Sequence, residues 1–70
     1  MKTNMEVLSG VLVIETEEED LKIVIDVPTG EVIMFEHEDV TMQRLVQFIN
    51  KAKTRYYRFL SSKAVEDFDI

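Results

Sequence analysis

The sequence contains no cysteine, so the protein can form neither a disulfide nor a thiolate metal site. It also lacks the GxSxG, P-loop and GxGxxG motifs that mark several classes of catalytic or nucleotide-binding site. Its longest apolar runs, "VLVI" and "VIMF", are far shorter than a membrane-spanning segment. The first ten residues lack the long apolar stretch of a secretory signal. These absences predict a cytoplasmic protein that is not an enzyme, binds no cofactor and does not enter a membrane.

The chain is short, and its 70 residues predict one domain. Folding at this length removes roughly 60% of the unfolded surface from water, which is close to the lower limit for independent stability. Because no disulfide is available, we expect oligomerisation to reinforce the core, and we predict a homodimer. We place the domain at residues 1–63 and treat residues 64–70, "AVEDFDI", as an acidic tail in which Phe68 and Ile70 are the candidate anchors.

Charge is divided unevenly along the chain, which carries a formal net charge of −6. Residues 1–42 contain eleven acidic side chains against only Lys2 and Lys22, whereas residues 43–63 contain six basic side chains and no acidic one. If the two parts fold as separate layers, the molecule has a strong dipole moment.

Alternating apolar residues predict three strands. The first covers residues 5–15 and is interrupted at Ser9-Gly10, which indicates a bulge or a close backbone approach. The second covers residues 21–27, and the third covers residues 31–36 after the turn "PTG" at 28–30. Because the connections are short, we expect an antiparallel meander.

The apolar period then changes from that of a strand to that of a helix over residues 40–62, with Asp39 or Thr41 as N-cap. Ile49 is the expected central core residue of this helix. The predicted fold is therefore α+β, a three-stranded antiparallel meander followed by one long C-terminal helix. The apolar stripe expected to face the sheet has Ala52 at its edge and consists of Met42, Leu45, Val46, Ile49, Tyr56 and Leu60.

Two apolar surfaces remain for a second subunit. A helix of this length measures about 34 Å, whereas a strand of seven residues spans only about 23 Å, so the helix should overhang the sheet. The overhang carries the predicted dimer interface, which is Tyr56, Tyr57, Phe59 and Leu60. The second surface is the sheet face opposite the helix, to which we assign Leu8, Leu12, Ile14, Val24, Ile33 and Phe35.

Acidic residues supply the candidate binding site. "ETEEED" at residues 15–20 separates two apolar runs, and a soluble hairpin loop with charges that oppose aggregation would explain it. However, acids continue through the sheet half of the chain. In an extended segment, alternate carboxylates are spaced by roughly 6.7 Å, which is of the same order as the separation of successive phosphates in a nucleic-acid strand. The predicted partner-binding residues are Glu15, Glu17, Glu18, Glu19, Asp20, Glu36, Glu38 and Asp39.

In size, charge and absence of catalytic motifs, the whole chain resembles the small acidic inhibitors that bacteriophages encode. These include DNA-mimic proteins that block histone-like HU proteins or other nucleic-acid-binding host factors. The resemblance concerns general character, so it assigns no role to any residue, and the basic helix departs from a uniformly acidic mimic. It implies a basic DNA-binding protein of the host as the partner and no direct binding to DNA.

Two other functions remain open for this sequence. Arg44, Lys51 and Arg58 recur every seven residues on one side of the helix, which is a possible nucleic-acid contact. A purely structural assembly subunit is a third possibility. Metal binding by "EHED" around His37 is disfavoured because neighbours on a strand point to opposite faces, and residues 17–20 lack the glycine and ligand spacing of a calcium loop.

Overall fold

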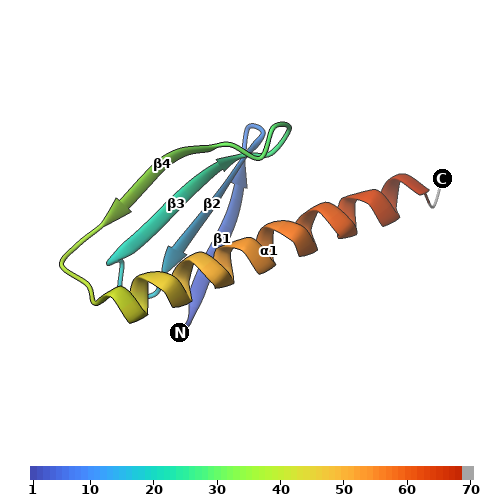
Figure 1. Ribbon diagram of the computed structural model, residues 1–70. Coiled ribbons are helices and arrows are strands. Elements are labelled where there is room, and N and C mark those ends of the chain that lie inside the picture. The colour runs from blue at the N-terminus through green and yellow to red at the C-terminus, as the bar shows by residue number, and fades with distance from the viewer. Residues whose placement is uncertain (69–70) are drawn as a thin grey trace.

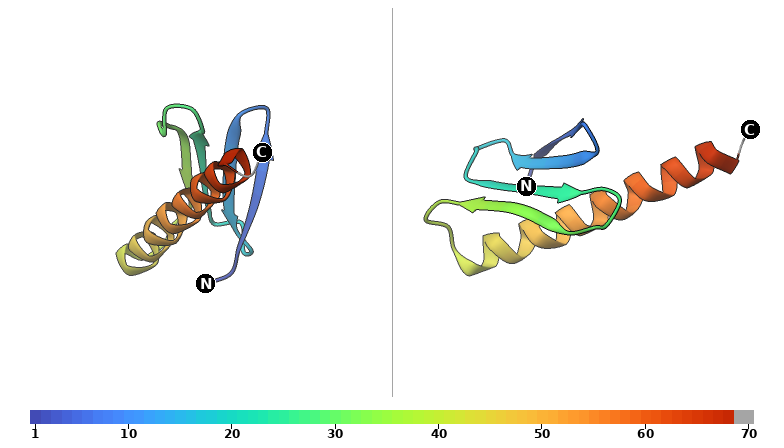
Figure 2. Two further views of the ribbon diagram at one scale, coloured as in Figure 1. Left: turned by 90° about the vertical axis from the view of Figure 1, so that its right-hand side faces the viewer. Right: turned by 90° about the horizontal axis from the view of Figure 1, so that it is seen from above.

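The computed structural model describes the backbone of residues 1–68 and the side chains of residues 1–62. The expected anchoring of the tail by Phe68 and Ile70 concerns side chains outside this description. The elements in chain order are β1 (Thr3–Leu8), β2 (Val11–Thr16), β3 (Leu21–Asp26), β4 (Val32–His37) and α1 (Met42–Phe68). The strands form one antiparallel sheet in the order β1-β2-β3-β4, and α1 runs diagonally across one face of it (Figures 1 and 2). The predicted α+β meander followed by a helix is confirmed.

The predicted number of strands is wrong, because residues 5–15 form most of two strands. Leu8 lies opposite Val11, so Ser9 and Gly10 make up a two-residue hairpin loop. Both have positive φ angles, 47° for Ser9 and 82° for Gly10. Positive φ at both loop positions is the type I′ geometry, whose twist matches that of the flanking strands. Since both arms are apolar, the interruption resembled a bulge within a single long strand.

The predicted turn between β3 and β4 is confirmed. The Gly30 N–H donates to the Asp26 carbonyl over 2.7 Å, and the Asp26 N–H donates to the Glu31 carbonyl over 2.8 Å. Gly30 has a φ of 77°, which a residue with a Cβ adopts only at a cost. A Cβ at this position would also lie 3.1 Å from the hydroxyl of Tyr56 on α1. Glycine therefore permits both the turn and the close approach of the helix.

The helix begins as expected at a threonine cap. The Thr41 hydroxyl accepts a hydrogen bond from the Arg44 N–H over 3.2 Å. With 27 residues, α1 is about 40 Å long, roughly twice the length of a six-residue strand, and it projects beyond the sheet (Figure 1). It continues to Phe68, beyond the expected end at residue 62. Within the described chain, no helix has a stretch apolar enough to cross a membrane.

The core is formed by one face of the sheet and one side of α1. Phe48 is fully buried, and its ring meets the edge of Phe35 at a centroid distance of 6.2 Å. The expected core residue Ile49 is 38% exposed, so that prediction is wrong. The buried hydrophobic residues of this core cluster are Leu12, Ile14, Leu21, Ile23, Ile25, Val27, Phe48 and Ala52.

The helix carries two adjacent apolar stripes, which explains the error. The stripe that packs on the sheet contains Leu45, Phe48, Ala52 and Phe59, whereas Met42 and Val46 belong to the neighbouring stripe and are exposed. Both sets follow helical spacing equally well, so periodicity alone does not determine which one is buried. Of the expected overhang, Tyr56, Phe59 and Leu60 pack against the core, and only Tyr57 is largely exposed.

The two sheet faces also differ from the expected assignment. Leu12, Ile14 and Phe35 lie on the face that α1 covers, not on the opposite face. The hairpin turn at Ser9-Gly10 reverses the chain, so the face of each arm is set by the pairing register rather than by one continuous alternation. The uncovered face carries two cross-strand rows, Val13–Val24–Met34 and Glu15–Lys22–Glu36.

Replacing Phe48 by alanine should lower the free energy of unfolding by about 3–5 kcal/mol, the usual range for a fully buried aromatic residue. Gln47 is its exposed neighbour, so Gln47→Ala should change the same quantity by less than about 0.5 kcal/mol. Urea unfolding followed by circular dichroism measures both variants. A cost below about 1 kcal/mol for Phe48→Ala would contradict its place at the centre of the core.

Candidate functional site

The acidic residues predicted to bind a partner gather at one end of the sheet. In an antiparallel meander, the last residues of β2 and β4 lie at the same end as the first residues of β3. The Glu38 N–H donates to the Asp20 carbonyl over 3.0 Å, which joins the end of β4 to the loop between β2 and β3. This acidic end comprises Glu15, Glu17, Glu18, Glu19, Asp20, Glu36, Glu38 and Asp39.

Thr16 holds the loop of the acidic end in one conformation. Its side chain is fully buried, and its hydroxyl oxygen accepts hydrogen bonds from the Asp20 and Leu21 N–H groups, each over 3.2 Å. The same hydroxyl donates to Asp20 Oδ1 over 2.5 Å, so its donor and acceptor capacity is used. Glu19 completes the turn with a φ of 62° and an N–H bonded to the Thr16 carbonyl.

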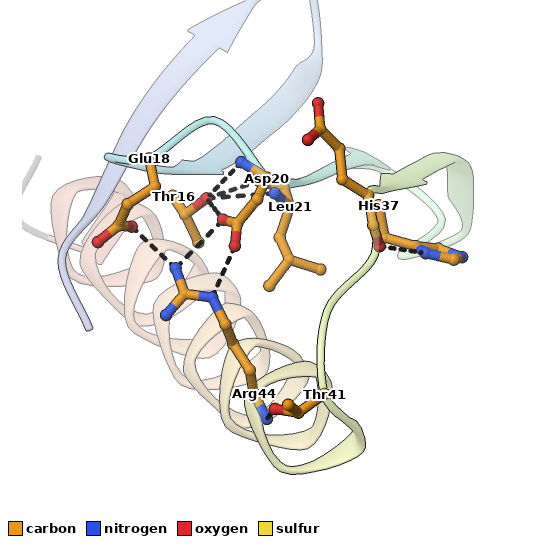
Figure 3. A network of polar contacts seen from close by, with 8 residues as sticks. Thr16, Glu18, Asp20, Leu21, His37, Thr41 and Arg44 are labelled. Atoms are coloured by element: carbon orange, nitrogen blue, oxygen red, sulfur yellow. Dashed lines mark hydrogen bonds and ion pairs between the residues drawn. The ribbon is translucent and has the colours of Figure 1, made fainter.

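Arg44 reaches from α1 to the same loop (Figure 3). Its Nε lies 2.7 Å from Asp20 Oδ2, and its Nη2 lies 2.8 Å from Glu18 Oε2. A second bond from Nη2 reaches Asp20 Oδ1 over 3.1 Å, so the guanidinium contacts both oxygens of the Asp20 carboxylate. Two of the acids in "ETEEED" therefore neutralise a base of their own helix and fix the loop against it.

These contacts shift the pKa values of Asp20 and Arg44. The hydrogen bond from Arg44, followed by the one from Thr16, lowers the pKa of Asp20 from 3.8 to about 2. The hydrogen bond to Asp20 raises the pKa of Arg44 above its ordinary value. Both shifts favour the charged forms, so the ion pair persists at any pH near neutrality.

A shallow hollow of about 400 Å³ lies within the acidic end. Five of the eight predicted acids line it, together with Leu21, Lys22, Phe35 and His37. Those five acids are Glu15, Glu19, Asp20, Glu36 and Glu38. Among the residues that the structure describes, no three or more His, Asp or Glu side chains are grouped to hold a metal ion. A hollow rimmed by carboxylates with aromatic and aliphatic walls suits the cationic head and apolar stem of a lysine or arginine.

The basic side of the helix is partly occupied by contacts within the chain. Arg44 binds the acidic loop, and the Lys51 ammonium donates to the carbonyl of Met1. Arg58 is exposed and lies beside Arg55 at a hollow near β1. Two of the three residues proposed for a nucleic-acid contact are thus engaged by their own fold.

Sequence reasoning missed the roles of Thr16 and Arg44. The four-residue separation of Thr16 and Asp20 around a turn is compatible with a side-chain contact to the loop backbone, which is a weak local signal. Arg44 is separated from Asp20 by 24 residues, so no local pattern connects them.

The Asp20 contacts predict a specific loss of stability in acid. The pKa of Asp20 is 3.8 when unperturbed and about 2 in the folded protein, so its contribution to stability is complete above about pH 4 and is lost as the pH falls toward 2. In Arg44→Gln, the pKa of Asp20 should move back toward 3.8, because its largest cause is removed. An NMR titration of the Asp20 carboxyl group measures both proteins. An unchanged pKa in the variant would contradict the assignment.

Comparison of the chain with protein-family models, curated protein sequences and solved structures returns no match.

Proposed function

We propose that this protein is a non-enzymatic binding protein whose acidic end occupies a basic surface of a partner protein. The observation that carries the proposal is the convergence of eight acidic residues from β2, the following loop and the end of β4 at one end of a small sheet. The nearby bases Arg44, Lys22 and Lys2 balance only part of this charge.

The acidic end is held rigidly by contacts within the chain, which strengthens the proposal. Binding by a mobile acidic loop would require ordering the loop, which reduces affinity. Here Thr16 and Arg44 already hold the loop, and Glu15 and Glu36 project from paired strands. Glu15 and Glu36 flank Lys22 on the uncovered face, two strand spacings or roughly 9.6 Å apart. A fixed array of carboxylates complements a basic groove without this ordering cost.

The partner class follows from the same array together with the resemblance to phage-encoded inhibitors. The extended row expected along Glu15, Glu17 and Glu19 is not formed, because residues 17–20 make a turn. Carboxylates on different strands, one or two strand spacings or about 5–10 Å apart, present charges at intervals of the same order as a row of phosphates. We propose that the partner is a basic DNA-binding protein, of which a histone-like protein is one kind, and that binding excludes DNA from it. Direct binding of DNA is less supported, because Arg44 and Lys51 contact their own chain and the acidic end repels phosphate.

A displacement experiment tests this function. Fluorescently labelled DNA is bound to a histone-like protein, and the acidic protein is added while anisotropy is recorded. The DNA should be released, and release should require more protein as salt increases, because surface charges are screened over about 10 Å at 0.1 M ionic strength. A direct mobility shift of DNA by the free acidic protein at physiological salt would contradict the proposal.

A matched pair of variants locates the binding site. Glu19→Gln/Glu38→Gln removes two charges at the hollow but keeps Glu18 and Asp20, which bind Arg44. We expect association with the histone-like protein to slow by about tenfold, since steering charges act mainly on encounter. Glu6→Gln/Glu31→Gln removes two exposed charges elsewhere and should have a much smaller effect. Equal slowing by both pairs would mean that net charge, and not the acidic end, determines binding.

A further inference from the structure

The second apolar stripe of α1 is uncovered. It consists of Met42, Val46, Ile49 and Tyr57, which are 73%, 48%, 38% and 64% exposed. Their spacing places them on one side of the helix, next to the stripe that packs on the sheet. Polar residues occupy the outward side of α1, including Gln43, Gln47 and Asn50. The exposed stripe is therefore a separate apolar surface and not scattered exposure.

The edge strand β4 lies beside this apolar surface. It pairs only with β3 in the described chain, so the backbone groups on its other side are open to pairing. Val32, Ile33 and Met34 are 55%, 59% and 38% exposed, with Val32 on the face that α1 covers and Met34 on the opposite face. Exposed apolar residues on an edge strand favour pairing with a further strand.

A groove of about 520 Å³ lies between this strand and the helix. Its lining includes Ile25, Val32, Ile49, Tyr56 and Leu60, with Lys53 as its charged residue. Tyr56 is held in place by a hydrogen bond from its hydroxyl to the Val27 carbonyl over 3.1 Å. The helix and the strand diverge because α1 crosses the sheet diagonally (Figures 1 and 2). The sheet face beside β4 is therefore left without a covering helix.

We propose that a second copy of this chain covers this surface, with the two β4 strands paired antiparallel about a two-fold axis. The eight strands then form one continuous sheet. The antiparallel arrangement brings the first turns of the partner copy's α1, with its exposed Met42 and Val46, toward the open end of the groove. Each copy fills the gap that the other leaves, as a two-fold interface requires.

Charge complementarity selects a second copy as the occupant. The His37 end of β4 is acidic, with Glu36 and Glu38, whereas the Val32 end has Lys53 of the groove beside the single acid Glu31. Antiparallel pairing places the acidic end of one β4 beside the Val32 end of the other, so Lys53 of each copy faces acids of the other copy.

The exposed apolar surface of α1 and β4 is large enough for a dimer interface. A standard interface takes about 800 Å² from each partner, roughly one sixth of the 5186 Å² that one chain exposes. The exposed stripe of α1 supplies four large apolar side chains and the edge strand β4 supplies three, and each is at least 38% exposed. A chain of 70 residues without a disulfide gains most from such burial.

Sedimentation equilibrium at micromolar concentration tests the dimer and its interface. The unchanged chain should be dimeric, and Val46→Glu should weaken self-association at least about tenfold by placing a charge in an apolar contact. Gln47→Glu is the matched control on the outward side of α1 and should stay within about threefold of the unchanged chain. Circular dichroism verifies that both variants are folded.

Cysteine crosslinking tests the same interface without a destabilising charge, because the chain has no cysteine of its own. A disulfide requires Cα atoms within about 7 Å, a separation that β4 residues near the two-fold axis meet. Oxidation of Ile33→Cys or Met34→Cys should therefore give a covalent dimer, and oxidation of Gln47→Cys should not. A monomer at all concentrations, or a dimer that Val46→Glu leaves intact and that forms no crosslink through β4, would overturn the proposal. Neither result depends on whether the acidic end binds a basic protein.

Discussion

Phe48 packs into the covered face of the sheet beside Phe35, and this contact sets the rotation of α1 about its own axis. The helix has a buried stripe, an exposed apolar stripe, an outward polar side and a basic side. This one rotation determines the direction in which each of them points. Once Phe48 points inward, Arg44 lies over the acidic loop, and the second apolar stripe lies toward β4. Arg55 and Arg58 lie toward β1, whereas Lys53 lines the groove beside β4. The internal ion pair and the uncovered groove are therefore consequences of the same packing contact.

The acidic stretch between β2 and β3 stabilises the fold and also forms part of the proposed binding site. Glu18 and Asp20 bind Arg44, while Thr16 satisfies the loop backbone from within the core. The buried Thr16 hydroxyl and the N–H groups of the loop both require hydrogen-bond partners, and each satisfies the other. The remaining acids then stand on a framework that does not need to be ordered upon binding. Glu18 and Asp20 thus stabilise the loop, whereas the other acids remain for the proposed binding.

A single helix over four strands leaves a small domain with open surfaces on the described chain. The helix covers β2 and β3 best, because it crosses the sheet diagonally (Figure 2). One sheet face, the β4 edge and the exposed side of α1 remain uncovered. The uncovered face carries apolar residues in its centre and a Glu15–Lys22–Glu36 row at the acidic end. Large exposed apolar surfaces in a small protein are typical of interaction sites.

Local patterns in the sequence were enough to predict an antiparallel meander, the turn at Gly30, the helix with a cap at Thr41, and the acids of the sheet half. These features depend on local period, on turn residues and on charge, which neighbouring residues express directly. The fourth strand formed by the hairpin at Ser9-Gly10, the burial of Phe48 in place of Ile49, and the binding of Asp20 by Arg44 were evident only in the folded chain. Burial of either helical stripe is nearly equal in local energy, and so are one bulged strand and two paired strands around Ser9-Gly10. The choice between them is made by long-range packing, which periodicity does not contain.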